Sequence, residues 1–288
     1  MKALTRTRSC GACIDLATQA WVRATGRCVS LSEHPWLEGP VGDVDRIGVE
    51  FFERFAQQRG WKVVETGTRG LLECFANLGG VSCDPAQVSP EIPRFYEQTS
   101  EYEFEAKSEW SPLFRPFGAA LSSIFSKRLQ QLNVPLSSLD TERGMVSRIV
   151  RLVDRQANLQ LTAWVREAVA TGHTVFAGSY SHCRVPGFDG QCVRVAFPLP
   201  NGYALVIMKP ESHPDGSFSV RSEGRRFGDP GFYFFVQAAP GRGWARYVAT
   251  MKESIHVFEG EGGVLRAEHA LSIWGMRFLR LHYRMPRR

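Results

Sequence analysis

Two groups of residues in this chain have side chains that could do chemistry, and both lie near turns of a predicted antiparallel sheet. The first group has the thiols and imidazoles of a zinc site and consists of His182, Cys183, Cys192, Glu211 and His213. Cys183 and Cys192 could reach one ion across a hairpin. Two small residues that pack face to face on adjacent strands would look the same. We favour this second interpretation and predict no metal and no cofactor.

The second group has what an acid/base or anion-binding site requires. It consists of His173, Arg225, Arg226, Asp229, His256, Glu259 and His282. Imidazoles titrate near neutral pH, carboxylates orient them, and guanidinium groups bind a carboxylate, a phosphate or an enolate. We predict His282, His256 and Asp229 as catalytic residues. The alternative is a solvated rim of turns, in which Arg225 and Asp229 form a surface ion pair of little energetic value.

Four residues are predicted to contact a ligand, namely Arg225, Arg226, His173 and Tyr233. Arg225 is the expected partner of an anionic group. His282 and His256 are preferred over His173 as the base, because a strand holds a side chain more rigidly than a turn does. His269 lies in the middle of a strand pattern and is expected to be a structural core histidine.

The sequence contains none of the common nucleotide-binding or hydrolase motifs. G-x-x-x-x-G-K-[ST], H-E-x-x-H, G-x-S-x-G and the kinase signatures are all missing, which disfavours the chemistries that they support. The glycine-rich stretch Gly224–Gly231 precedes a strand pattern and not a helix. It is therefore predicted to be a hairpin loop and not a phosphate-binding loop.

The composition is that of an ordinary soluble globular protein. Of its 288 residues, 43% are hydrophobic and 22% are charged. No apolar run of about 18 residues could span a bilayer, and the first residues lack the apolar core of a signal peptide. We therefore predict a cytoplasmic protein without a membrane span. Its seven cysteines are expected to be mostly reduced and buried.

The net charge of +6 comes from 35 Lys and Arg against 29 Asp and Glu, and the basic excess gathers at the two ends. No nucleic-acid-binding motif accompanies this charge. The terminal arginines are therefore predicted to be solvated tails, and nucleic acid is not an expected partner. The sequence does not indicate an oligomeric state.

The stretch from Val193 to Val236 reads as four strands separated by turns. Pro-Asn-Gly, Pro-Asp-Gly and Gly-Asp-Pro-Gly divide runs of β-branched and aromatic residues, because Pro presets φ and Gly accepts positive φ. This pattern predicts an antiparallel meander whose successive loops alternate between two ends of the sheet. On that topology the second group of residues meets at one end. Tyr203–Lys209 is apolar on both alternating faces, which predicts a strand covered on both sides.

Helices are predicted in three places. Asp15–Thr25 has loosely helical spacing, and a second helix carries apolar residues from Ile47 to Phe55 and ends at Gly60. Pro112–Leu132 shows apolar residues at intervals of three and four over its whole length, which predicts a long amphipathic helix.

Other segments of the first hundred residues give weaker signals. Gly70–Leu78 is predicted to be a short helix, and Trp61–Thr66 and Ser100–Trp110 are predicted strands. The prolines at 85, 90 and 93 predict an extended connection. The further predicted strands are Gly144–Val153, Leu159–Val169, Thr174–Cys183, Cys192–Phe197, Ile255–Phe258, Val264–Trp274 and Arg277–Met285. Trp244–Ser254 is compatible with a helix or a strand.

The element order is a strand, a long helix and then eight or nine antiparallel strands, which predicts an α+β fold. This order resembles the START-type helix-grip fold, and less closely a lipocalin-like calyx, over about residues 95–288. The resemblance implies a curved antiparallel sheet around the helix 112–132, with an apolar ligand pocket between them. We divide the chain into an N-terminal helical region, residues 1–90, and a sheet domain, residues 91–288.

These expectations converge on the handling of a small hydrophobic molecule, or of one with an anionic head. One hypothesis is a cofactor-independent cyclase, isomerase or hydrolase that uses His and Arg at the mouth of the pocket. The alternatives are a non-catalytic carrier or sensor, and a structural or partner-binding protein whose sheet packs shut. Only catalysis requires a base that converges on the ligand with a shifted pKa.

Overall fold

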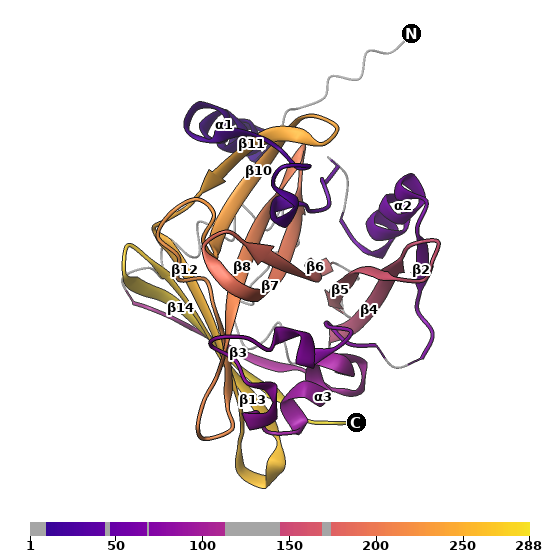
Figure 1. Cartoon of the computed structure of the whole chain (residues 1–288), viewed down its shortest axis with the longest axis vertical. Coiled ribbons are helices and arrows are strands. Elements are labelled where there is room, and N and C mark those ends of the chain that lie inside the picture. Colours follow the sequence, from indigo (N-terminus) through magenta and orange to yellow (C-terminus); the bar gives the residue numbers. More distant parts are fainter. Residues whose placement is uncertain (1–9, 44–46, 68, 113–144, 169–173) are drawn as a thin grey trace.

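The structure is a computed structural model that describes residues 10–43, 47–67, 69–112, 145–168 and 174–288. Its main element is a sheet of 14 strands (Figure 1), and every pairing between the described strands is antiparallel. The strands are β1 Arg27–Ser30, β2 Lys62–Val64, β3 Glu105–Trp110, β4 Met145–Val153, β5 Leu159–Ala168, β6 Thr174–Val185, β7 Phe188–Leu199, β8 Gly202–Ser212, β9 Phe218–Arg221, β10 Gly231–Ala239, β11 Arg242–Tyr247, β12 Met251–Glu259, β13 Leu265–Ile273 and β14 Met276–Met285. The prediction of a large antiparallel sheet is thus confirmed.

The sheet divides at β8. Residues 202–207 of β8 pair with β10, whereas residues 209–212 pair with β9. One branch runs from β8 through β7, β6, β5 and β4 to β2, and a second runs through β10 and β11 to β1. The third runs through β9, β12, β13 and β14 to β3. β7, β8 and β9 therefore form the predicted meander, but β10 returns to β8 and does not continue beside β9.

The described helices are few. α1 is Cys10–Thr25, which lies beside β10 and β11 in Figure 1, and α2 is Val49–Arg59. Both predicted helices in these regions are confirmed, and α2 ends as expected at Gly60, which has a φ of 67°. The helix predicted over residues 70–78 is reduced to a 3₁₀ turn, Phe75–Leu78. The helix predicted for residues 112–132 lies, apart from Pro112, outside the described residues.

The extended connection predicted around the three prolines is wrong. The chain forms a 3₁₀ turn at Pro85–Gln87 and then the helix α3, Glu91–Glu97. Pro90 precedes α3 and Pro93 lies in its first turn, where backbone N–H groups have no helical partner and a missing one costs little. The prolines therefore mark a helix start. Trp244–Ser254, left open by its pattern, contributes to β11 and β12 with a turn between them.

Both faces of β8 are covered, as its sequence predicts. On one face, here called the inner face, Val206 and Met208 pack in a cluster with α3 and other residues between 71 and 102. On the opposite, outer face, Tyr203, Leu205 and Ile207 pack against the segment that carries β1 and a 3₁₀ turn, Pro35–Leu37. A third cluster joins α2 to β4, β5 and β6.

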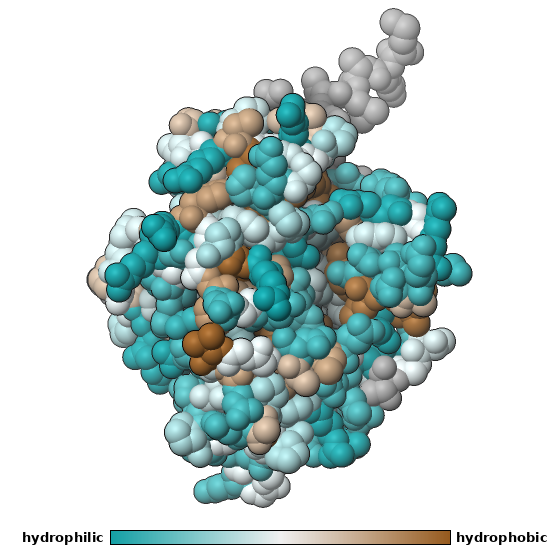
Figure 2. Space-filling model, in the orientation of Figure 1, coloured by the Kyte–Doolittle hydropathy of each residue, from teal (hydrophilic) through white to brown (hydrophobic). Residues whose placement is uncertain are grey.

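The face of the molecule drawn in Figure 2 shows no large apolar patch among the described residues. Figure 2 shows one face of the molecule, on which teal and white areas dominate and brown areas are small and separate. Among the described helices none is long and apolar enough to cross a membrane. The largest apolar groupings of the described residues are instead internal.

Candidate functional site

A cavity lies between the inner face of the sheet and the segment that carries α3. Its walls come from β5–β8 on one side and from β9 and β12–β14 on the other, and Leu71, Phe95, Tyr96 and Phe104 line it from the α3 segment. The centre of a water-sized sphere can move through about 130 Å³ of this space. One water molecule needs only ~10–15 Å³ on that measure, so the cavity has room for a small organic molecule.

Aromatic rings form much of the wall around Trp164. The ring centroid of Trp164 lies 4.7 Å from that of Phe104, 5.4 Å from Phe176 and 6.0 Å from Tyr180. Phe176 in turn contacts Phe197 edge to face at 5.6 Å. Rings in this arrangement offer flat, apolar surfaces to a ligand.

Arg166 brings a charge into this wall. It follows Trp164 by two residues on β5, so both side chains point to the inner face, and Arg166 is only 8% exposed. Its guanidinium carbon lies 5.3 Å from the Phe104 ring centre and 5.6 Å from that of Trp164. Nε and Nη2 are buried, and neither has a hydrogen-bond partner among the residues that the structure describes. Burial lowers the pKa of this arginine, because the charged form is partly deprived of water.

Two tyrosines and an acid/base pair complete the polar lining. His269 on β13 and Glu253 on β12 bring Nε2 and Oε1 within 2.8 Å, with side chains 15% and 12% exposed. The contact is an ion pair when His269 is protonated, but its angles are not those of a hydrogen bond. Burial raises the pKa of Tyr180 well above its usual value and that of Tyr283 to about 12. Both phenols also respond to the charges of Arg166 and Glu253, so the polar groups form one cluster.

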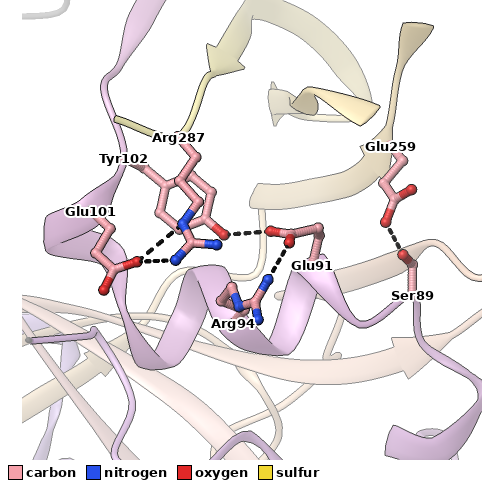
Figure 3. A network of polar contacts seen from close by, with 7 residues as sticks. All are labelled: Ser89, Glu91, Arg94, Glu101, Tyr102, Glu259 and Arg287. Atoms are coloured by element: carbon pink, nitrogen blue, oxygen red, sulfur yellow. Dashed lines mark hydrogen bonds and ion pairs between the residues drawn. The ribbon is translucent and has the colours of Figure 1, made fainter. Parts of the chain in front are cut away.

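A polar network surrounds α3 and joins the segment that carries it to later parts of the chain (Figure 3). Glu91 accepts hydrogen bonds from the Tyr102 hydroxyl at 2.7 Å and from Arg94 at 2.6 Å. Arg287, just beyond β14, donates to Glu101 at 2.8 Å, and Ser89 donates to Glu259 at the end of β12. These contacts attach the α3 segment to the C-terminal strands at both of its ends.

The carboxylate of Glu91 should make the stability of this network depend on pH. Burial alone would raise the Glu91 pKa, but the hydrogen bonds from Tyr102 and Arg94 outweigh it and lower the pKa. A lowered folded-state pKa stabilises the protein above the unfolded-state pKa, and that stabilisation is lost as pH falls through the folded-state value. We expect Glu91→Gln to flatten the fall in unfolding free energy between about pH 5 and pH 3, measured by urea titration. The exposed Glu33→Gln is the control, and equal curves for the two variants would contradict the assignment.

The turn Gly224–Gly231 lies away from the histidines that were predicted to share a site with it. Gly187, in the β6–β7 hairpin, donates its N–H to the Gly228 carbonyl at 2.9 Å. The turn is therefore beside the β6–β7 hairpin, which the alternation of loops in the predicted meander would place at the opposite end of the sheet. The physical reason is the shortness of β9, which has four residues and pairs only with residues 209–212 of β8, so that the chain turns away from β8 halfway along that strand. The predicted meeting of Arg225, Arg226 and Asp229 with His256 and His282 is thus corrected.

Asp229 serves the turn itself. Its Oδ2 accepts the backbone N–H groups of Arg225 at 2.9 Å and Arg226 at 3.1 Å, and its backbone carbonyl accepts the Tyr233 hydroxyl at 2.5 Å. Tyr233 is fully buried on the outer face, in the cluster that contains Trp36. Neither Asp229 nor Tyr233 lines the inner cavity.

Removing the Asp229 carboxylate should therefore destabilise the fold. We expect Asp229→Ala to cost about 1 kcal/mol, the usual net contribution of hydrogen bonds of this kind, because it removes the acceptor of two exposed backbone N–H groups. Arg226→Ala should change stability by less than about 0.5 kcal/mol, because that side chain is 85% exposed. Urea titrations of both variants measure the difference. Equal, small losses would show that the carboxylate is not needed for the turn.

The predicted catalytic histidines lie on the outer face. Ser219 Oγ stands between two imidazoles, 2.8 Å from His213 Nε2 and 2.9 Å from His256 Nδ1. His256 has its pKa lowered, mainly by burial and then by His213. His282 faces Glu109 at 3.3 Å. His256 and His282 are both opposite Glu268 in the strand register, so they share a row across the sheet. His173 lies outside the described residues.

The thiol pair behaves as packed small residues. Cys183 and Cys192 are opposite each other in the register of β6 and β7, and both belong to the outer cluster. Burial raises the pKa of Cys183 to about 11 and raises that of Cys192 further. No group of three or more His, Cys, Asp or Glu side chains within the described part of the chain is placed to hold a metal ion.

Sequence reasoning missed the residues that give the cavity its polarity, namely Arg166, Tyr180, Glu253, His269 and Tyr283. A signal for Arg166 was present. In L-Q-L-T-A-W-V-R-E-A, the strand alternation puts the arginine on the same face as Trp164. His269 was noticed but taken for a satisfied core histidine.

The fold and the cavity together define a class: an antiparallel-sheet protein with an internal cavity that is apolar in its walls and charged at one cluster. No protein-family model matches the chain, and no solved structure does. The chain is similar to the uncharacterized membrane protein YndJ of Bacillus subtilis (strain 168), with 28% identity over 240 residues. The match covers 83% of this chain and 41% of that protein.

This similarity corrects one prediction. A cytoplasmic protein was expected, whereas the relative is named as a membrane protein. The prediction depended on the lack of a long apolar run and of a signal peptide, and neither property determines where a protein works.

Proposed function

We propose that this chain binds a small, largely apolar molecule that carries an anionic group, and that the molecule occupies the inner cavity. The observation that carries the proposal is the Arg166 guanidinium, which is buried beside aromatic rings. Within the described part of the chain, its Nε and Nη2 have no hydrogen-bond partner. A buried charge without a partner costs several kcal/mol or more. Cation–π contacts return only about 0.5–2 kcal/mol, so an anionic ligand is the natural partner.

The shape and lining of the cavity support the same class of ligand. Its space suits a molecule of a few rings or a short chain, and its aromatic walls suit apolar, flat groups. The relative's name adds a membrane context, where acidic amphiphiles are common. A carrier or sensor needs nothing more than this binding. The predicted helix grip around residues 112–132 and the domain boundary near residue 90 stay predictions from the sequence.

Two dyes of matched shape test the proposal. 8-Anilinonaphthalene-1-sulfonate (ANS) and N-phenyl-1-naphthylamine have the same rings, but only ANS carries a negative charge. We expect the protein to bind both dyes. The Arg166→Met substitution should weaken the binding of ANS by about 10- to 100-fold, as the loss of a hydrogen bond to a charged group does. Its affinity for the uncharged dye should stay the same. Fluorescence titration gives both dissociation constants.

Controls separate binding from unfolding. Arg226→Met removes an exposed arginine and should leave both affinities unchanged. Arg166→Met should keep or raise the melting temperature, because replacing a buried unpaired charge by an apolar side chain is neutral or stabilising. Unchanged ANS affinity in a folded Arg166→Met variant would overturn the proposal.

A further inference from the structure

The cavity holds more than an anion-binding arginine, because Glu253 and His269 line the same space. Glu253 is opposite Leu271 and His269 is opposite Ile255 in the register of β12 and β13, so the two are diagonal neighbours on the inner face. The Nε2–Oε1 distance of 2.8 Å places the carboxylate in ion-pair contact with the imidazole, although the angles are not those of a hydrogen bond. Binding an anionic molecule does not require such a pair.

The backbone that carries the Glu253 carboxylate is held by hydrogen bonds on both of its polar groups. Glu253 donates its backbone N–H to Ser222 Oγ at 2.8 Å, and Ser222 donates its own N–H to the Glu253 carbonyl at 2.9 Å. His269 is stacked on Tyr283, with ring centroids 6.4 Å apart and planes 22° apart. A base on two paired strands, fixed by neighbours, has the positional accuracy that proton transfer requires.

The polar groups of the cavity are also electrostatically connected. Tyr180 and Tyr283 each respond to Arg166 and to Glu253, so the phenols lie within range of both the cationic and the anionic group. A ligand in this space meets a base on one strand pair and an anion-stabilising guanidinium on another. That combination suits a reaction in which a proton leaves carbon and negative charge develops on a nearby oxygen.

We propose that the cavity is a proton-transfer site for a keto acid or a similar carbonyl compound with an apolar body, in which His269 is the base, Glu253 positions it and Arg166 holds the anion. This inference depends on the binding proposed above. The negative charge of Glu253, 2.8 Å from Nε2, favours a proton on that nitrogen, so Nδ1 is the nitrogen that we assign as the proton acceptor.

The reaction needs no cofactor and no oxidant. The C–H bond next to the carbonyl breaks, its proton goes to His269, and its electron pair moves into the carbonyl group to give an enolate. The Arg166 guanidinium stabilises that charge. Return of the proton to oxygen or to carbon gives the enol or the ketone, so the net change is a tautomerisation or an isomerisation.

Phenylpyruvate is the probe for a test, because it combines a phenyl ring, a carboxylate and an acidic CH₂ next to a ketone. In D₂O, proton NMR measures the exchange of this CH₂ with solvent, and calorimetry measures binding. We expect wild-type protein to accelerate exchange over buffer. His269→Asn and Glu253→Gln should each lose about 10²-fold or more of the acceleration, the usual contribution of general base catalysis, with an unchanged dissociation constant.

Further variants identify the roles. Glu253→Asp should restore part of the exchange rate, which a merely structural role would not predict. The His282→Asn variant, changed on the outer face, should catalyse the exchange of phenylpyruvate at the wild-type rate. Arg166→Met should lose phenylpyruvate binding along with exchange.

The outcomes separate the two proposals. Failure of wild type to bind either dye or phenylpyruvate would remove the binding function. Binding of ANS or phenylpyruvate without accelerated exchange would overturn the proton-transfer site and leave the binding function standing. Full exchange in a folded His269→Asn variant would also overturn the assignment, because the base would then lie elsewhere.

Discussion

Replacing Phe218 with alanine is expected to destabilise the protein by about 3–5 kcal/mol, the range for a large aromatic side chain lost from a core. Phe218 is fully buried on β9. Its ring lies 4.9 Å from that of Phe75 and 5.6 Å from that of Tyr96. The residue therefore joins the inner face of the sheet to the segment that carries α3, and its loss should loosen the wall of the cavity.

Urea titration followed by tryptophan fluorescence measures this loss. Phe218→Leu is the matched control, because it keeps an apolar side chain of similar volume and should cost less than about 1.5 kcal/mol. A loss below about 1 kcal/mol for Phe218→Ala, well under the usual core range, would mean that the α3 segment does not pack on the sheet as described.

The second large effect is expected at Tyr203, on the opposite face of the sheet. This side chain is fully buried, its ring stacks on Phe235 at 4.8 Å, and its hydroxyl donates to the Leu37 carbonyl at 2.6 Å. Tyr203→Ala should cost about 3–5 kcal/mol. Tyr203→Phe keeps the ring and leaves a buried carbonyl without its donor, so about 1–3 kcal/mol is expected.

The two Tyr203 variants together separate the contribution of the ring to stability from that of the hydroxyl. Thermal and urea unfolding should rank them as wild type, then Tyr203→Phe, then Tyr203→Ala. Equal stability of the two variants would assign the whole effect to the hydrogen bond. Equal stability of Tyr203→Phe and wild type would show that the Leu37 carbonyl finds another donor.

Local periodicity was sufficient to predict most strands. β8 is the clearest case, because Tyr203–Lys209 is apolar at every position but the last, and the structure covers both of its faces. Alternation along a strand and turn residues between strands are properties of a few neighbouring residues. A single sequence shows them directly.

The division of the sheet could not be predicted in this way. It depends on β9 having only four paired residues and on β10 returning to the first half of β8. Both features depend on which distant strands pair with each other. The turn signal Gly224–Gly231 is compatible with a β10 that pairs with β9 and with a β10 that pairs with β8. The error in strand order then moved Arg225 and Asp229 to the wrong end of the sheet.

The candidate site was missed for a related reason. Alternation places Arg166 beside Trp164 on β5, but nothing local shows that this face turns toward a cavity. The other wall of the cavity is formed by β12, β13 and β14, which begin more than eighty residues after Arg166 in the sequence. A charged residue on a face that is otherwise apolar was the available warning, and it applied to His269 as well.

β1 and β3 pair with strands that lie far away in the sequence, and this affects the order in which the sheet can form during synthesis. β1 pairs with β11, and β3 pairs with β14, where Glu105 and Arg284 are 179 residues apart. Synthesis proceeds from the N-terminus, so these strands leave the ribosome long before their partners exist. The strands from β4 to β8 pair through hairpins with short loops, so each of them has a partner soon after it is synthesised. β1 must therefore wait for β11, and β3 for β14, with their strand edges unpaired until those late strands have been synthesised.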